Sequence, residues 1–188
     1  MNLDDNFASI SGVIIEKSEI GFIVQSFRKS DKENLIWVWG LPSELKVGTC
    51  VNVIGELEAR PVYRGCTKNI LGIKAYCHFI EDVSPEKYVA FDDFACVSGE
   101  IVWYSDLRLT PKNRSRIFEF KILMKNDVFV RIIAWNGLAE KIFREFKLGD
   151  KIEIEGILCS RKYLKQDQDG CMIEKITTEI NAQKIRIA

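Results

Sequence analysis

The chain has 188 residues, of which 47% are hydrophobic, so it can bury one large core or two modest ones. Lysine plus arginine and aspartate plus glutamate each number 27, so the net charge gives no argument for a polyanionic partner. Any attraction to such a partner must be local, and the second half carries the slight excess of basic residues.

Targeting and cofactor signals are weak. The start, MNLDDNFASI, has no basic stretch, and nowhere do about 18 uncharged apolar residues stand together, so we expect a cytoplasmic protein without a signal peptide or membrane span. Six cysteines form no C-x-x-C pair and are expected as free thiols, with a metal site at Cys66, Cys77 and His78 as the weaker alternative. One histidine and no phosphate-binding glycine loop predict neither an enzyme nor a cofactor.

The chain repeats itself. FASISGVIIE at 7–16 is echoed by FACVSGEIVW at 94–103, and LKVGTCVNVIGELEAR at 45–60 by FKLGDKIEIEGILCSR at 146–161. The repeat predicts two domains, 1–84 and 91–188, joined by a polar linker over 81–93.

Each copy predicts five strands, because short runs rich in Ile, Val, Phe and Trp are broken by Gly, Asn and Asp. The first copy predicts strands near 7–16, 20–28, 34–40, 50–60 and 70–80. The second copy predicts them near 94–104, 116–124, 128–136, 150–163 and 173–187. Glycines inside these runs predict bulges or sharp bends, at Gly12, Gly55, Gly99 and Gly156.

One helix is expected between the third and fourth strands of the second copy. Leu138, Ile142 and Phe146 follow at intervals of four residues, and Gly149 is a plausible stop. The first copy has only LPSELKVG there, where Pro42 allows a single turn. Five strands with this helix position, twice over, predict an all-β chain of two tandem oligonucleotide-binding (OB) barrels.

The run VRIIAWNGLAEKIFREFKLGDKIEIEGILCSRKY, followed by a polar hairpin and KITTEINAQKIRI, closely resembles the bacterial single-stranded DNA-binding protein (SSB) family. The resemblance covers roughly 94–187 and reaches the first copy only in outline. It implies that Phe129, Trp135 and Tyr163 stand where such proteins stack bases. Family members usually end in a flexible tail with an acidic, hydrophobic tip, whereas this sequence ends at KIRIA, which favours a specialised protein of a mobile element or phage, or a primosome accessory.

The third strand of the second copy carries the main candidate site. Strand alternation puts one set of side chains on the solvent face, namely Phe129, Arg131, Ile133 and Trp135, and the aliphatic set on the core face, namely Val130, Ile132 and Ala134. Flat rings that stack bases and cations that follow phosphates are what binding of single strands requires. Packing in the barrel or a subunit interface is the commoner role of strand aromatics and stays open.

Two further segments of the second copy are basic. Tyr163 lies in the polar hairpin RKYLKQDQDG, where its cationic neighbours are Arg161, Lys162 and Lys165. The long loop between the first two strands carries Arg108, Lys112, Arg114 and Arg116, and such a loop grips oligonucleotides in OB barrels or is simply solvated. The pattern does not assign the faces of Trp103 and Phe118.

The first copy repeats the aromatic theme with Trp37 and Trp39 on one face of its third strand. These rings could extend the groove, or they could pack against the other barrel or a partner subunit. Further contact candidates in this copy are Arg60, Tyr63 and Arg64.

Together these features predict binding of single-stranded DNA without strong sequence preference, in replication, recombination or repair. The resemblance implies self-association into a dimer of two-barrel chains, through exposed edges of the first strands. Two alternatives stay open: an OB adaptor that docks on a helicase, primase or polymerase, and the binding of single-stranded RNA.

Overall fold

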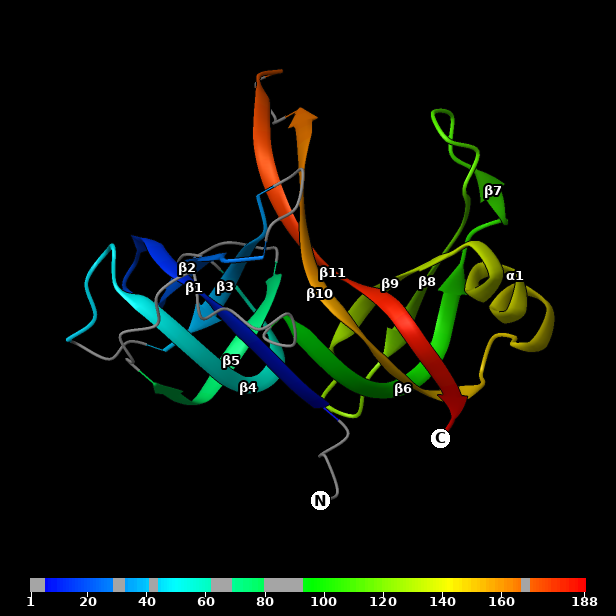
Figure 1. Cartoon of the computed structure of the whole chain (residues 1–188), viewed down its shortest axis with the longest axis horizontal. Coiled ribbons are helices and arrows are strands. Elements are labelled where there is room, and N and C mark those ends of the chain that lie inside the picture. The colour runs from blue at the N-terminus through cyan, green and yellow to red at the C-terminus, as the bar shows by residue number, and fades with distance from the viewer. Residues whose placement is uncertain (1–5, 29–32, 41–43, 62–68, 80–92, 167–169) are drawn as a thin grey trace. The chain divides into compact units, whose positions relative to one another are not determined.

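The computed structural model describes residues 6–28, 33–40, 44–61, 69–79, 93–166 and 170–188 (Figure 1). The first copy contains β1 (Asn6–Lys17), β2 (Gly21–Ser26), β3 (Leu35–Trp39), β4 (Cys50–Pro61) and β5 (Asn69–Phe79). The second contains β6 (Phe94–Tyr104), β7 (Arg108–Leu109), β8 (Arg116–Leu123), β9 (Phe129–Trp135), α1 (Asn136–Glu145), β10 (Lys151–Gln166) and β11 (Met172–Ile187). Over these described residues, the prediction of an all-β chain with one short helix before the fourth strand of the second copy is confirmed.

The strands of each copy pair in the same cyclic order. In the first copy β1 pairs with both β2 and β4, and the ring runs β1, β2, β3, β5, β4. In the second copy β6 pairs with both β8 and β10, and the ring runs β6, β8, β9, β11, β10, with β7 added beside β8. The third and fifth strands are parallel in both rings. The repeat in the sequence is therefore a repeat in topology.

The core of the second ring follows from strand alternation. In β10, Ile152, Ile154 and Leu158 are buried, while Glu153 and Glu155 between them are partly exposed. The helix α1 adds Ala139 and Ile142 to this core. The chain turns out of the helix at Phe146, whose N–H donates to the Ile142 carbonyl at 3.0 Å.

The strand glycines mark close approaches of neighbouring strands. A Cβ at Gly55 would lie 2.0 Å from the Lys74 carbonyl oxygen, and a register shift falls between Ile54 and Gly55. A Cβ at Gly156 would lie 2.4 Å from the Asn181 carbonyl oxygen. Near Gly12 and Gly99 the register shifts come a few residues later, at 14/16 and 101/103.

Gly156→Ala should destabilise the fold by about 2 kcal/mol, because the new methyl group overlaps backbone that cannot move alone. Gly137→Ala is the matched control, since a Cβ there has no neighbour within 4 Å. Gly137 lies in α1, and alanine has a higher helix propensity than glycine. Urea unfolding of both variants measures the difference. Equal midpoints for Gly156→Ala and the unmutated chain would contradict the close approach.

Contacts divide the chain into two compact units that do not coincide with the two copies. Of the described residues, unit 1 contains 6–8, Phe94–Leu158 and Glu179–Ala188, and unit 2 contains Ser9–Asp93 and Cys159–Thr178. The outer half of the β10–β11 hairpin, Cys159–Thr178, is hereafter called the arm. The arm comes from the second copy but packs in unit 2, while the predicted domain boundaries 1–84 and 91–188 remain a prediction.

Within the described ranges, no helix is long and apolar enough to cross a membrane, and no cluster of three potential metal ligands occurs. Cys66 lies outside the described residues, as do the side chains of Cys77 and His78. Cys50 and Cys96 are free thiols. Burial and the nearby Glu153 raise the pKa of Cys96 to about 11, so this thiol stays protonated at neutral pH.

Candidate nucleic-acid interface

The strand β9 separates its side chains as the alternation predicts. Phe129 is 61% exposed and Trp135 is 39% exposed, whereas Val130, Ile132 and Ala134 are fully buried. Ile133 shares the side of the two rings but is itself covered. Two large aromatic rings thus stand in solvent at the two ends of a strand whose other side is core.

The register between β8 and β9 extends this side into a surface. Cross-strand partners in an antiparallel pair share a face. The surface, hereafter the outer face, consists of Ile117, Glu119, Lys121 and Leu123 from β8 opposite Trp135, Ile133, Arg131 and Phe129 from β9, with Arg108 of β7 opposite Ile117. Phe118 points the other way and is buried, with its ring centroid 5.7 Å from that of Phe120.

The turn after β9 holds Trp135 at the end of the strand. Asn136 begins α1 with a φ of 49°, a conformation that asparagine tolerates better than most residues. The Trp135 Nε1–H donates to Asn181 Oδ1 of β11 at 3.4 Å. The indole therefore has one polar anchor within unit 1, and part of the ring remains open.

Arg131 is engaged by two carboxylates. Its Nη2 lies 2.7 Å from Glu119 Oε2 and its Nη1 lies 3.5 Å from Glu179 Oε2, and only 19% of its side chain is exposed. These ion pairs tie β8, β9 and β11 together. They favour a structural role for Arg131 over the predicted phosphate contact.

The basic segment before β8 is an ordered hairpin. The Thr110 N–H donates to the Ser115 carbonyl at 2.9 Å, and the Arg114 N–H donates to the Thr110 carbonyl at 3.1 Å. Two of its four cations form ion pairs, Arg108 with Glu119 at 3.3 Å and Arg116 with Glu140 at 2.6 Å. Lys112 and Arg114 are exposed and form no ion pair with the described residues. These two cations of the hairpin can therefore contact a ligand.

The arm carries the other predicted group. Tyr163 is 38% exposed, and Arg161 and Lys165 are exposed beside it. Lys162 forms an ion pair with Glu33 at 2.9 Å. The structure thus places Phe129, Arg131 and Trp135 on one strand of unit 1, whereas Tyr163 and its neighbours belong to unit 2.

Of the two interpretations of Trp37 and Trp39, the structure favours packing over an extension of the groove. The rings are 6% and 2% exposed and stack on each other with centroids 5.3 Å apart. They form a core cluster with Ile23 and Leu35, against which Ile176 of the arm packs. The covering residues come from unit 2 itself, so no partner subunit is needed to bury these rings.

Polar contacts fix the arm on this side of β3. The Leu35 N–H donates to Ser160 Oγ at 2.7 Å, and the Ser160 N–H donates to Asn34 Oδ1 at 2.7 Å. Thr178 Oγ1 donates to the Leu71 carbonyl at 2.9 Å. The side of β3 that corresponds to the outer face of unit 1 is therefore closed.

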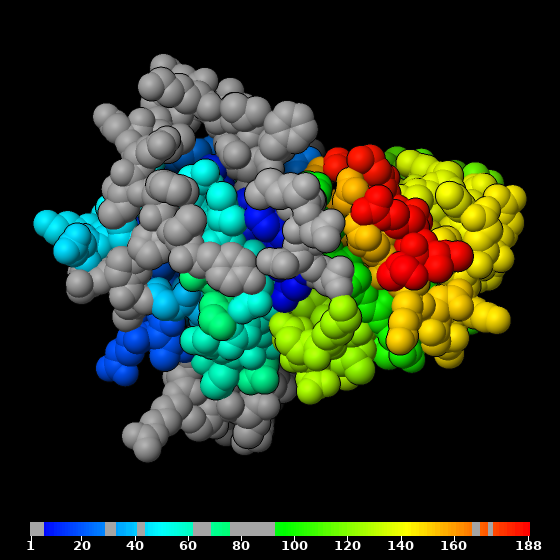
Figure 2. All heavy atoms as spheres, turned by 90° about the horizontal axis from the view of Figure 1, so that it is seen from below, coloured from blue at the N-terminus to red at the C-terminus, as the bar shows by residue number. Residues whose placement is uncertain are grey.

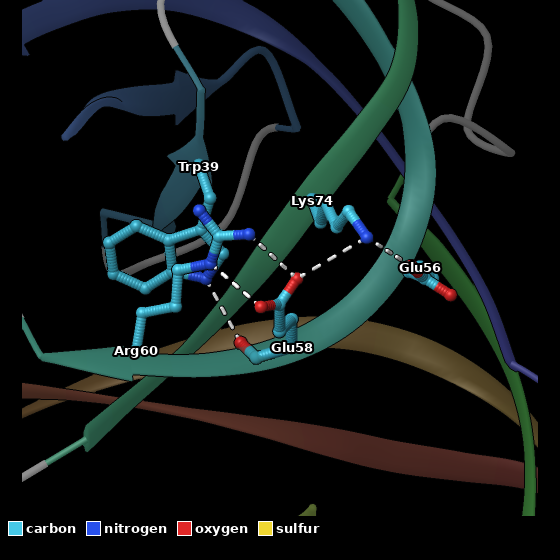
Figure 3. A network of polar contacts seen from close by, with 5 residues as sticks. All are labelled: Trp39, Glu56, Glu58, Arg60 and Lys74. Atoms are coloured by element: carbon cyan, nitrogen blue, oxygen red, sulfur yellow. Dashed lines mark hydrogen bonds and ion pairs between the residues drawn. The ribbon is translucent and has the colours of Figure 1, made fainter. Parts of the chain in front are cut away.

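Arg60 is bound in a network next to Trp39 (Figure 3). Its guanidinium contacts the Glu58 carboxylate at 2.7 and 3.1 Å, and Lys74 reaches Glu56 at 3.1 Å and Glu58 at 3.9 Å. The Glu58 carbonyl accepts a hydrogen bond from Trp39 Nε1 at 2.9 Å. Tyr63 and Arg64 lie outside the described residues.

Two cations near the C-terminus of unit 1 are paired as well. Residues near the C-terminus, red in Figure 2, lie against β10 in orange. Lys184 contacts Glu155 at 2.9 Å, and Arg186 forms an ion pair with Glu153.

Sequence reasoning missed Lys121 and left Trp103 unassigned. The alternation in RIFEFKIL, with Phe118, Phe120 and Ile122 inward, would have placed Lys121 on the outer face. The face of Trp103 depends instead on a register shift between Ile101 and Trp103, which no residue pattern in the sequence marks. Trp103 pairs with Lys121 and is 42% exposed.

The fold is similar to that of the single-stranded DNA binding protein from Thermus aquaticus. The crystal structure of the wild-type protein matches with a TM-score of 0.68 and 16% identity over 97% of this chain and 92% of that chain. A deletion mutant of the same protein matches with a TM-score of 0.68 and 16% identity over 97% and 94%. No protein-family model matches the sequence, and neither does any curated protein. The resemblance to the SSB family is confirmed at the level of the fold.

Proposed function

We propose that the protein binds single-stranded DNA without strong sequence preference on the outer face of unit 1. The observation that carries this proposal is the exposure of Phe129 and Trp135 on β9, whose opposite side is core. Exposure of two large aromatic rings on one face is typical of a surface that a ligand covers. Bases supply such a cover, because every base has a π face that can stack on an aromatic ring.

In this proposal the aromatic rings bind bases and the cations bind phosphates. Bases stack on Trp135 and Phe129, and the phosphates follow Lys112 and Arg114 of the hairpin and Lys121 of β8. The proposal takes each ring of strands as an OB barrel, and in such barrels the second and third strands and the loop before them hold oligonucleotides. Tyr163, Arg161 and Lys165 on the arm form a separate contact patch of unit 2.

Titration with oligo-dT tests the proposal. Tryptophan fluorescence should be quenched, and the logarithm of the affinity should fall against the logarithm of the salt concentration. The three phosphates neutralised by Lys112, Arg114 and Lys121 alone should contribute a slope of about −2. Absence of binding at micromolar protein and low salt would contradict the proposal and favour the adaptor. Competition with a matched RNA strand distinguishes the two nucleic acids, because a 2′-hydroxyl contact would give the RNA an advantage.

Oligo-dT of graded lengths then reports how much of the chain takes part. Saturation at a short length is expected, because the corresponding side of β3 is closed by the arm. We further propose a role in replication, recombination or repair and self-association into a dimer, for which sedimentation of the free chain is the direct measurement.

A further inference from the structure

We propose that Trp103 and Lys121 form an additional nucleotide subsite, which extends the track of bases from β9 across β8 to β6. The inference rests on the proposed function and names residues that the SSB resemblance does not supply. Its elements are a ring with an open surface, a cation beside it and a backbone irregularity that directs the ring outward.

The register shift in β6 decides where Trp103 points. Ile101 pairs with Ile122 and is buried, and regular alternation would send Trp103 to the same side. The extra residue between them changes the phase, so Trp103 pairs with Lys121 of the outer face. Tyr104 then pairs with Phe120 on the core side.

Trp103, Lys121 and Arg131 consequently lie in one row across three strands, because Lys121 also pairs with Arg131. Arg131 is held by Glu119 and Glu179, as described above. Lys121 is exposed and forms no ion pair with the described residues, and its ammonium lies 5.1 Å from the centre of the Trp103 ring. Lys121, the cation of this row that no carboxylate of the described residues engages, therefore lies next to the exposed ring of Trp103.

This pair matches the chemistry of one nucleotide. The indole of Trp103 offers a flat surface for a base, and the flexible stem of Lys121 lets its ammonium turn from the ring to a phosphate. Phe129 precedes Arg131 by two residues in β9 and lies on the same face. A strand of nucleotides that runs from the β9 rings across β8 would reach Trp103 next.

Tryptophan fluorescence of full-length variants provides a direct test. The chain has four tryptophans, of which Trp37 and Trp39 are buried, so quenching by oligo-dT must come from Trp103 and Trp135. Trp135→Phe should keep part of the quenching, because Trp103 still stacks. The double variant with Trp103→Phe and Trp135→Phe should show no quenching of its tryptophan fluorescence while still binding fluorescein-labelled oligo-dT.

Affinity for the labelled oligo-dT gives the second readout. Trp103→Ala should weaken binding about 5- to 150-fold, as expected for one lost stacking contact, and Trp103→Phe should restore most of it. Lys121→Gln should reduce the magnitude of the salt slope by about 0.7. Tyr104→Ala is the matched control, because this neighbour is 41% exposed but belongs to the opposite side, and it should leave quenching and salt slope unchanged.

The outcomes separate the two proposals. Binding by the unmutated chain, together with unchanged affinity of Trp103→Ala and no quenching in Trp135→Phe, would overturn the subsite and leave the proposed function standing. No binding by the unmutated chain would remove the proposed function and the subsite with it. Circular dichroism of each variant confirms that a loss reflects binding and not unfolding.

Discussion

Replacement of both Phe129 and Trp135 by alanine should weaken binding of oligo-dT about 30-fold or more. Each ring that loses a stacked base costs about 1 to 3 kcal/mol, and 1.4 kcal/mol corresponds to a factor of ten in affinity. The fold should tolerate the change, because both side chains are substantially exposed and the core side of β9 is untouched. Fluorescence anisotropy of labelled oligo-dT measures the affinity, and urea unfolding measures the stability.

Leu148→Ala serves as the control for this experiment. Leu148 is 55% exposed in unit 1 but lies after α1, outside the outer face, so its loss should leave the affinity unchanged. If the double variant binds as tightly as the control, then β9 is not the binding surface. A loss of affinity in both variants would indicate that general apolar exposure, and not the outer face, attracts the oligonucleotide.

Trp39→Ala should lower the stability of the protein but leave its affinity for oligo-dT unchanged. The ring is 2% exposed, stacks on Trp37 and donates a hydrogen bond to the Glu58 carbonyl. Removal of a buried aromatic side chain typically costs about 3 to 5 kcal/mol through lost burial and the cavity left behind. We expect this loss in urea unfolding, and we expect the folded fraction to bind oligo-dT as before.

Trp135→Ala provides the comparison, since it should lose affinity with a stability change of about 1 kcal/mol or less. A Trp39→Ala variant that is stable but binds poorly would mean that the β3 rings contact the ligand after all. Such a result would require the arm to leave β3, because Ile176 and Ser160 pack and bond there.

How far the sequence predicts the site depends on the residue. The faces of β9 were predictable, since Val130, Ile132 and Ala134 alternate with larger and more polar side chains in a strand with one buried side. The same logic failed for Trp37 and Trp39, because a strand shows its own alternation but not whether another segment covers its second side. The cover here comes from more than a hundred residues further along the chain.

Charge was equally hard to assess from the sequence. Arg131 is an outward cation by strand alternation, yet only the fold shows that Glu119 and Glu179 surround it. A pattern of residues gives the count of cations on a face but not the carboxylates brought beside them from other strands. Trp103 depends on a bulge, and a bulge moves every following side chain to the opposite face.

The arm also affects how the protein can be divided. A fragment that ends at the linker would lack Cys159–Thr178 and would leave the Trp37 and Trp39 cluster open to water, with the Leu35 N–H and the Asn34 amide deprived of Ser160. Such a fragment is a candidate for aggregation. Limited proteolysis in the linker should accordingly leave the two pieces associated, since the arm of one piece is part of the packed interior of the other.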